Sequence, residues 1–511
     1  MSKKLSRREM LLLLGTGAAG ALLARCGKAP TPETIIQTVE VEKVVERTVE
    51  VETVVEKLVE VETVVEKLVE AEGIIPWKYP GLDNPFGGEK VTLSFWDWHR
   101  PRIDMLERWF KKYTEAHPNV TFEITLVPGE DIATKLMAAI PAGAAPDFHY
   151  YHNDWGPETW VWGGLLSPFP NDMFPTGPMT ESFSALGTWL GPQGQIYWIP
   201  TGYMSAALYY NKDIFAEEGL TEDELPTTWD ELIELGKRLT TYDAAGRVER
   251  SGFNTNDYEE NYQYLYHQQG YFRWNEGYER ACYHNEPTIK ALQWIRDVNH
   301  EHKLCDDDFL NWFDAFGSGK AAMVLAWTWY TNWLNVNIPE ANFGVSRIPT
   351  WDGSFEPTIG WGSCDPQSPV VPSTTANDRK ATCFDVIGSL YSDPEFLIDN
   401  ALTLSSPPGT LQIADNPLVQ RDPTIQAVAE QSGWILTGLA GPPLAYEAHT
   451  RMTDAIFKVG DPIEDALQTL QMEIDQMTDE YIEESGDEVR ERWNEHKYAH
   501  ADMMKYPEVM S

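Results

Sequence analysis

The order of strand-like and helical patterns within residues 90–151 is the feature that most restricts how this chain can fold. Residues 90–95 alternate apolar and polar side chains as a strand does, and residues 102–114 repeat apolar side chains at helical spacing. The next three segments are predicted to be a strand, a helix and a short strand, at 119–127, 131–140 and 148–151. A β-α-β-α-β order predicts a mostly parallel sheet that is covered by helices on both faces.

The same patterns return further along the chain. Strands are predicted at 208–211 and 321–326, a helix at 288–299, and another helix that begins within 226–231 with Thr228 as its N-cap. The chain has 511 residues, whereas a domain usually has about 100 to 200. Two α/β units in succession are therefore expected.

The balance of charges excludes one class of partner. Lys and Arg number 39 against 79 Asp and Glu, which gives a formal net charge of −40. Such a field repels the phosphates of nucleic acids, so we expect no nucleic acid partner. The 42% of hydrophobic and 23% of charged residues are ordinary for a globular protein, and most of the chain is expected to fold in water.

The first 26 residues have the pattern of an export signal. Basic residues at the start precede an apolar run at 10–24, which is short for a membrane span. Residues 6–11 resemble a twin-arginine export signal, and residues 23–27 resemble a lipoprotein cleavage box in which Cys26 is lipidated, although Arg25 replaces the usual small residue. We predict a signal peptide at 1–25 and a lipid anchor at Cys26 on the outer face of the cytoplasmic membrane, at the cell surface or in the periplasm. A retained amino-terminal anchor is the alternative.

A ten-residue repeat follows at 41–70, where VEKVVERTVE is succeeded by two copies of VETVVEKLVE. Ten residues are too few for a solenoid unit, and so acidic a segment cannot bury a core alone. Its spacing fits a helix, a self-associating coil or an extended chain. Together with the Pro- and Gly-rich stretch at 74–88, it makes residues 26–88 a predicted lipid-anchored stalk and linker.

The remaining cysteines, Cys282, Cys305, Cys364 and Cys383, have no C-x-x-C spacing. In an exported chain this favours disulfides over zinc, and three pairings are possible. The predicted helix at 288–299 would separate Cys282 from Cys305. A local bridge between Cys364 and Cys383 is therefore the favoured pairing.

Aromatic and polar side chains gather where the predicted strands end, which is where ligands bind in open α/β sheets. Trp-bearing segments stand at three such ends, 96–100, 152–155 and 327–330, and a further Trp stands between glycines at 360–362. Flat aromatic faces beside Asp, Asn and Arg suit a sugar, whose C–H faces stack while its hydroxyls form hydrogen bonds. Burying roughly 50 Å² per face at ~25 cal/mol/Å² contributes on the order of 1 kcal/mol per stack. The strand ends therefore predict a carbohydrate site.

A secreted carbohydrate-active enzyme would share the aromatic signal, but it needs two opposed carboxylates with separated pKa values. Only Asp97 and Asp154 stand at the predicted strand ends, where we expect them to accept hydrogen bonds from sugar hydroxyls. We therefore predict no enzyme activity and no cofactor. No metal site is expected, because His149 and His152 point to opposite faces on or just after a strand. A surface adhesion protein, the third class, is suggested only by the repeat.

Several longer segments resemble the extracellular solute-binding proteins of ABC sugar importers, the family of the maltodextrin-binding and other oligosaccharide-binding proteins. They lie, in the order of the family, at 146–155, 196–220, 225–240, 316–329 and 342–353. The resemblance implies a two-lobed periplasmic-binding-protein-like fold of class II. It also implies a protein that captures a sugar or oligosaccharide in the cleft between the lobes and delivers it to the permease subunits of an ABC importer.

The resemblance also implies the boundaries of the lobes. The first lobe is predicted at 89–203 plus 346–395, the second at 204–345 plus 396–485, and an acidic C-terminal tail at 486–511. The hinge crossings are expected near Tyr203, at 344–348 and at 392–400.

The same resemblance assigns ligand-binding residues by position. In the first lobe, five positions match those that contact sugar: Trp96, Trp98, Arg100, Asp154 and Trp155. The other predicted ligand-binding residues are Tyr203, Asp257, Tyr258, Tyr271, Trp327, Trp329, Trp361 and Tyr446. Met204 departs from the family pattern, because it stands where the malto-oligosaccharide binders have an acidic residue.

Overall fold

The computed structural model describes residues 77–152, 155–183, 186, 190–200, 202–256, 261–275, 280–354, 360–365, 368–432, 435–436, 445–486, 488–489 and 505–510. All of these residues belong to one compact body, Val59–Ser511. The parts of this body that pack around its first and its second sheet are called the first and the second unit below. The predicted signal peptide, Cys26 and the repeat at 41–70 lie outside the described residues. Among the helices that are described, none is both long enough and apolar enough to cross a membrane.

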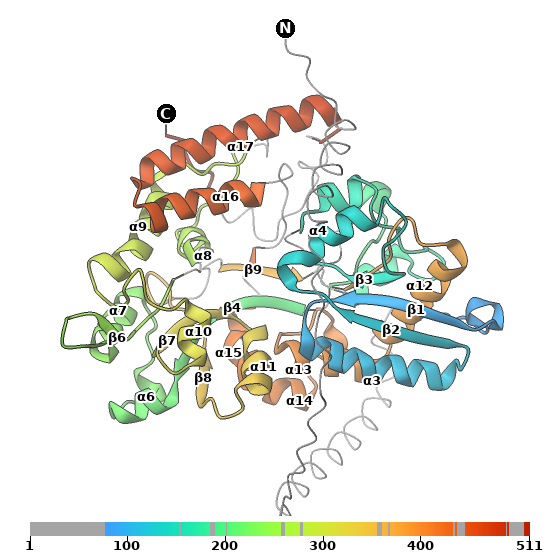
Figure 1. The fold of residues 1–511 in the computed structure, drawn as a ribbon, viewed down its shortest axis with the longest axis horizontal. Helices are drawn as coiled ribbons and strands as arrows, with labels where there is room; N and C mark the ends of the chain where they lie inside the picture. Colours follow the sequence, from blue (N-terminus) through green and yellow to red (C-terminus); the bar gives the residue numbers. More distant parts are fainter. Residues whose placement is uncertain are drawn as a thin grey trace, which may run out of the picture. The chain divides into compact units, whose positions relative to one another are not determined.

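The first sheet is mostly parallel, as predicted. Strand β1 (Val91–Asp97) pairs in parallel with β2 (Val120–Leu126) and with β3 (Phe148–Tyr150), and only β10 (Pro369–Val370) is antiparallel (Figure 1). The strand order is β10-β3-β1-β2. The crossovers are α3 (Arg100–Ala116) and α4 (Gly129–Ala139), so the β-α-β-α-β prediction is confirmed.

Helix α3 shows why this sequence folds against the sheet. Its apolar side chains recur at helical spacing, and Leu106 and Phe110 are buried in the core with Phe95 of β1. The Phe110 ring stacks on Phe122 of β2 with centroids 4.3 Å apart. The same core receives side chains from α12 (Asn377–Tyr391) and α13 (Pro394–Leu404).

The second sheet is built around β4 (Gly202–Asn211), which is mostly buried. Three strands pair antiparallel with β4, namely β7 (Met323–Trp327), β8 (Phe343–Ser346) and β9 (Gly360–Asp365). Strand β11 (Ile435–Leu436) is parallel to β9. The second unit is thus α/β as predicted, but its sheet is mostly antiparallel because β4 runs opposite to its three partners.

The helices of the second unit include the predicted ones. Helix α7 (Trp229–Leu239) begins after Thr228, whose side chain accepts a hydrogen bond from the Glu231 amide at 3.1 Å while the Glu231 carboxylate accepts one from the Thr228 amide at 3.1 Å. This reciprocal capping box confirms Thr228 as the N-cap. Helix α9 (Glu286–His300) confirms the helix predicted at 288–299.

The remaining elements connect or cover these layers. They are η1 (Pro85–Gly88), η3 (Glu158–Trp162), α5 (Thr176–Ser182), η5 (Pro192–Gly194), α6 (Lys212–Glu217), η6 (Glu222–Glu224), β5 (Thr241–Tyr242), β6 (Val248–Arg250), α8 (Asn261–His267), α10 (Trp312–Gly317), α11 (Trp329–Asn337), η7 (Leu411–Ile413), α14 (Pro417–Arg421), α15 (Pro423–Ser432), α16 (Ala445–Asp454), η8 (Ala455–Val459) and α17 (Ile463–Ser485). Of these, η3 and η8 are π-helical turns.

The chain passes between the two sheets at three places. The first passage precedes β4, as expected near Tyr203. The second lies between the end of β9, which pairs in the second sheet, and the start of β10, which pairs in the first. The expected place at 344–348 is wrong, because both β8 and β9 pair in the second sheet.

The third passage was expected at 392–400, but α13 still packs on the first unit. The Phe396 ring contacts Trp109 of α3 edge-on with centroids 5.4 Å apart, and the Asp399 carboxylate accepts a hydrogen bond from the Trp109 indole at 2.8 Å. Ile425 also belongs to the first core, whereas Val428 belongs to the second. The passage therefore lies in α15, and residues 396–425 pack with the first unit although the predicted second lobe resumes at 396.

The predicted disulfide between Cys364 and Cys383 is wrong. Cys383 is a free thiol in α12, fully buried in the first core, and its sulfur lies 3.8 Å from the carbonyl oxygen of Asp147. Burial raises the pKa of the Cys383 thiol well above its usual range. Cys282 and Cys305 are also free and buried, so all three behave as small core side chains.

Candidate functional site

Four of the predicted aromatic residues gather at the carboxyl end of the first sheet. The rings of Trp98 and Trp155 lie 5.4 Å apart, and Trp155 lies 4.8 Å from the buried Trp160. Trp96 and Tyr203 pack against the same cluster. Each of the four predicted residues, Trp96, Trp98, Trp155 and Tyr203, is half-buried, so part of each ring faces out of the cluster. This cluster is called the first aromatic wall below.

A buried ion pair holds this wall in place. The Asp97 carboxylate, at the end of β1, accepts hydrogen bonds from the backbone amides of Trp98 at 2.6 Å and His99 at 3.1 Å. It also accepts two from the Arg102 guanidinium, at 2.8 and 2.6 Å. That guanidinium lies over the rings of Trp98, at 4.8 Å, and Tyr150, at 3.6 Å. These contacts fix the backbone at the end of β1, where Trp98 follows the strand.

Asp97 itself does not have the role expected from the sequence. It is fully buried, and its two oxygens are engaged by Arg102 and by backbone amides, so it is not placed to accept a hydrogen bond from a sugar hydroxyl. Burial and pairing make it a residue that positions Trp98.

A second aromatic group lies at the end of β7 in the other sheet. Trp327 is the last residue of β7 and Trp329 the first of α11, and both are half-buried. The Trp329 ring lies 6.4 Å from Phe313 and 6.0 Å from Tyr330, and Trp327 lies 6.3 Å from Tyr264. These aromatic side chains, with Trp327 and Trp329 partly open, form the second aromatic wall.

The two walls meet at His99. The His99 ring, at the start of α3, approaches the Trp329 ring edge-on with centroids 6.4 Å apart. Because His99 directly follows Trp98, this contact brings the first wall and Trp329 to the same place although they belong to different sheets.

His99 is a residue that the sequence prediction missed. Both of its ring nitrogens are buried and have no hydrogen-bond partner within the described part of the chain. Burial, with the nearby charge of Arg102, lowers the pKa of His99 to about 3. A neutral imidazole offers one donor and one acceptor, and leaving both unpaired costs free energy unless a ligand or water engages them. The sequence feature that could have identified His99 is its position directly after Asp97 and Trp98 at the end of a strand.

The other predicted residues contribute less to this arrangement. Arg100 is exposed and forms an ion pair with Asp104 of the same helix at 2.8 Å. Tyr271 is half-buried, and the ammonium of Lys505 lies 5.8 Å from its ring. Five further predicted residues lie wholly or in their side chains outside the described part of the structure: Asp154, Asp257, Tyr258, and the side chains of Trp361 and Tyr446.

A separate pocket of about 90 Å³ lies in the second unit, between α9 and the turn η8. None of the predicted ligand-binding residues lines it; its walls include Asn256, Asn299, Phe309 and Phe457. Within the described ranges, no group of three or more His, Cys, Asp or Glu side chains is placed to hold a metal ion. The aromatic walls therefore remain the strongest candidate for the site.

Comparison with known proteins places this architecture in a family. The model of the bacterial extracellular solute-binding protein family matches residues 108–427, and the chain belongs to this family. An arabinooligosaccharide-binding protein of Halalkalibacterium halodurans is 21% identical over 348 residues, which cover 65% of this chain and 74% of the relative. A maltotriose-binding protein of Pyrococcus abyssi is 22% identical over 345 residues, 66% of this chain and 70% of the relative.

The fold is shared with solved structures. One is a maltose/maltodextrin-binding domain from Bdellovibrio bacteriovorus bound to maltotriose, with a TM-score of 0.63 at 18% identity, covering 76% of this chain and 99% of that one. The predicted α/β fold with two lobes is therefore confirmed.

Proposed function

We propose that this protein is an extracytoplasmic solute-binding lipoprotein that captures a sugar or oligosaccharide between its two lobes and delivers it to the permease subunits of an ABC importer. Membership of the solute-binding family and the names of the oligosaccharide-binding relatives support this proposal. The chain would act by binding alone, without a cofactor.

The contact of His99, the residue after Trp98, with Trp329 of the second aromatic wall is the observation that carries the proposal. Trp98 and Trp155 on one side and Trp329 on the other offer half-buried rings at strand ends of two different sheets, joined through the edge contact of His99 with Trp329. Such faces stack on the C–H surfaces of a sugar at on the order of 1 kcal/mol each. His99 would supply the polar contact, since its neutral ring can donate one hydrogen bond to a sugar hydroxyl and accept another.

The alternative of a secreted carbohydrate-active enzyme is disfavoured by the state of Asp97. A glycosidase needs two carboxylates free to act as acid and as base or nucleophile. The Asp97 carboxylate is held by Arg102 and by two backbone amides, so it is not available for that chemistry. No observation favours the adhesion protein over the solute-binding protein.

Binding is tested by calorimetric titration of the purified mature protein with a panel of neutral saccharides. The panel should include arabino-oligosaccharides, maltotriose and glucose, with amino acids and dipeptides as the comparison. We expect at least one oligosaccharide to bind with a micromolar or lower dissociation constant, about −8 kcal/mol. Binding of an amino acid or peptide, with no heat from any saccharide, would overturn the proposed ligand class.

The location is part of the same proposal and has its own test. Lipidation of Cys26 behind a twin-arginine signal would hold the protein on the outer face of the membrane. Exchange of Cys26→Ser is expected to move the exported protein from the membrane fraction to the soluble fraction. Identical fractionation of both proteins would refute the lipid anchor. Retention of an Arg7→Lys, Arg8→Lys precursor in the cytoplasm would support the twin-arginine route.

A further inference from the structure

Helix α17 carries a direct hydrogen bond from the second unit to the first. The Tyr481 hydroxyl, near the carboxyl end of α17, donates to the Glu158 carboxylate at 2.5 Å. Tyr481 packs against the core of the second sheet, whereas Glu158 is 6% exposed and its neighbours Trp160 and Val161 lie in a core cluster of the first unit. A contact between side chains of two lobes exists only at the lobe arrangement that brings them together.

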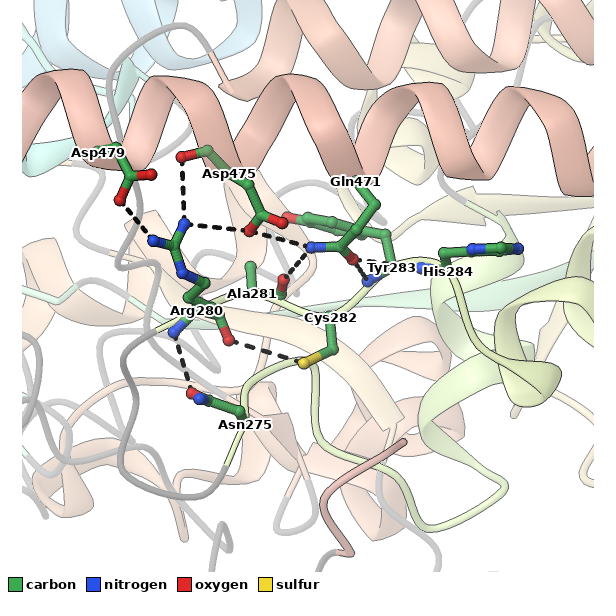
Figure 2. Close-up of polar contacts among 9 residues, drawn as sticks. All are labelled: Asn275, Arg280, Ala281, Cys282, Tyr283, His284, Gln471, Asp475 and Asp479. Carbon is green, nitrogen blue, oxygen red and sulfur yellow. Dashed lines mark hydrogen bonds and ion pairs between the residues drawn. The ribbon is translucent and has the colours of Figure 1, made fainter. Parts of the chain in front are cut away.

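The amino-terminal and middle parts of α17 are fixed to the second unit. Its side chains Leu467, Leu470 and Ile474 are buried in the core of that unit. Figure 2 shows the polar contacts of the same helix: Gln471 accepts a hydrogen bond from the Tyr283 amide at 2.8 Å and donates one to the Ala281 carbonyl at 3.0 Å.

Two ion pairs add to this attachment. Arg280 pairs with Asp475 at 3.3 Å, and also with Asp479, one turn further along α17 (Figure 2). Asp479 stands two residues before Tyr481. The helix is thus held to the second unit almost up to Tyr481, so a movement of that unit moves the Tyr481 hydroxyl with it.

The other partner, Glu158, belongs to the segment that supports the first aromatic wall. It is the first residue of the π-helical turn η3, which also contains Trp160. The Trp160 ring lies 4.8 Å from Trp155, and Trp155 lies 5.4 Å from Trp98. Glu158 is therefore connected to the wall by rigid packing over a single turn.

We propose that Tyr481 and Glu158 are positioning residues that hold the two lobes in the closed arrangement and so determine how long a bound ligand stays. This inference rests on the proposed function for the ligand, but the state of the lobes can be measured without one. Opening must break the hydrogen bond, so the open arrangement loses the contact between the Tyr481 hydroxyl and the Glu158 carboxylate. Loss of the Tyr481 hydroxyl removes this bias toward closure, so dissociation should accelerate while association changes little.

The test uses the mature chain with Tyr481→Phe, which deletes only the hydroxyl. Glu158→Gln is the second variant, because an amide oxygen still accepts a hydrogen bond but carries no charge. Tyr210→Phe is the matched control, since the Tyr210 hydroxyl donates to the Glu222 carboxylate at 2.6 Å entirely within the second unit. All variants are first compared by thermal melting, so that a folding defect is recognised.

The primary readout is the distance distribution between spectroscopic labels at positions 115 and 223, exposed sites in the first and second unit, in the sugar-free protein. Tyr481→Phe is expected to raise the open fraction, Glu158→Gln to raise it less, and Tyr210→Phe to leave it unchanged. The second readout is the dissociation rate of the tightest saccharide, which should rise about tenfold in Tyr481→Phe, or about 1.4 kcal/mol.

Distances that are the same in Tyr481→Phe and in the wild type, with both proteins folded, would overturn the proposal whether or not a saccharide binds. An equal shift in Tyr210→Phe would also overturn it, since the effect would then be one of general stability. If no saccharide binds to any of the proteins, the proposed function fails, while the label distances still decide on the positioning pair.

Discussion

At the scale of single residues, exposure separates the aromatic side chains that pack from those that can meet a ligand. Trp77, Trp160, Trp198 and Trp229 are at most 2% exposed and belong to the cores. The described tryptophans that were predicted to bind ligand are all half-buried. Trp96 and Trp327 stand in the last two residues of their strands and Trp98 and Trp329 follow within two residues, at the sheet edge where ligands bind in open α/β sheets.

Replacement of Trp329 tests this distinction directly. Trp329→Ala removes one ring of the second aromatic wall but leaves the core intact, so sugar affinity should fall by about 2 kcal/mol, roughly thirtyfold, with little change in melting temperature. The control is Trp229→Ala in the same unit, where loss of a buried ring should cost about 3 to 5 kcal/mol of stability. Calorimetric titration measures the affinity of both variants for the sugar, and thermal melting measures their stability. A large loss of melting temperature in Trp329→Ala with unchanged affinity would contradict the binding role.

The buried histidines give the protein a predictable response to acid. Burial lowers the pKa of His99, His267 and His449 to about 3 and that of His149 to about 4. The unfolded chain binds protons at these groups below pH ~6.5 and the folded chain does not, so stability is lost as the pH falls from about 6.5 through the folded pKa values.

His99→Gln should remove one of these protons. Between pH 6 and pH 4 the free energy of unfolding should then fall less steeply than in the wild type, by about 1.4 kcal/mol per pH unit. Urea denaturation at several pH values measures the slope. Parallel slopes for the two proteins would mean that His99 takes up its proton equally in the folded and unfolded states, contrary to its burial.

At the scale of elements, local sequence patterns predicted correctly those features that depend on neighbouring residues alone. The spacing at 90–151 predicted β1, α3, β2, α4 and β3 in the right order and with the right parallel pairing, and Thr228 marked the start of α7. The features that the sequence did not predict depend on residues that are far apart in the chain. The direction of β4 against its neighbours, the packing of α13 on α3 and the free thiol of Cys383 follow from contacts that no local pattern contains.

The capping box at α7 offers a test at this scale. Thr228→Ala removes the acceptor for the Glu231 amide, and the free energy of unfolding should fall by about 1 kcal/mol. Thr228→Ser keeps the hydroxyl and should restore most of it. Chemical denaturation of the three proteins compares them, and an equal loss in the Ala and Ser variants would assign the effect to the lost methyl group instead of the cap.

At the scale of the whole molecule, the candidate site exists only because two units are brought together. Trp98 and Trp155 are fixed by the first core and Trp329 by the second, and the sequence could place each at a strand end without giving their separation. The family resemblance implied that residues of the two lobes line one cleft, and the contact of His99 with Trp329 agrees with this expectation. A pair such as Tyr481 and Glu158, 323 positions apart, carries no signal in the sequence.

Ligand binding is therefore expected to compact the molecule. A sugar that touches both walls gains contacts in the closed arrangement that it lacks in the open one, and this difference in affinity shifts the population toward closure. Small-angle scattering of the purified Cys26→Ser protein should show a smaller radius of gyration at saturating saccharide than without it. Tryptophan fluorescence on the same samples reports occupancy, since rings of the walls become covered. Saturated fluorescence with an unchanged radius, in a protein whose label distances show an open sugar-free state, would mean that one wall binds the ligand alone.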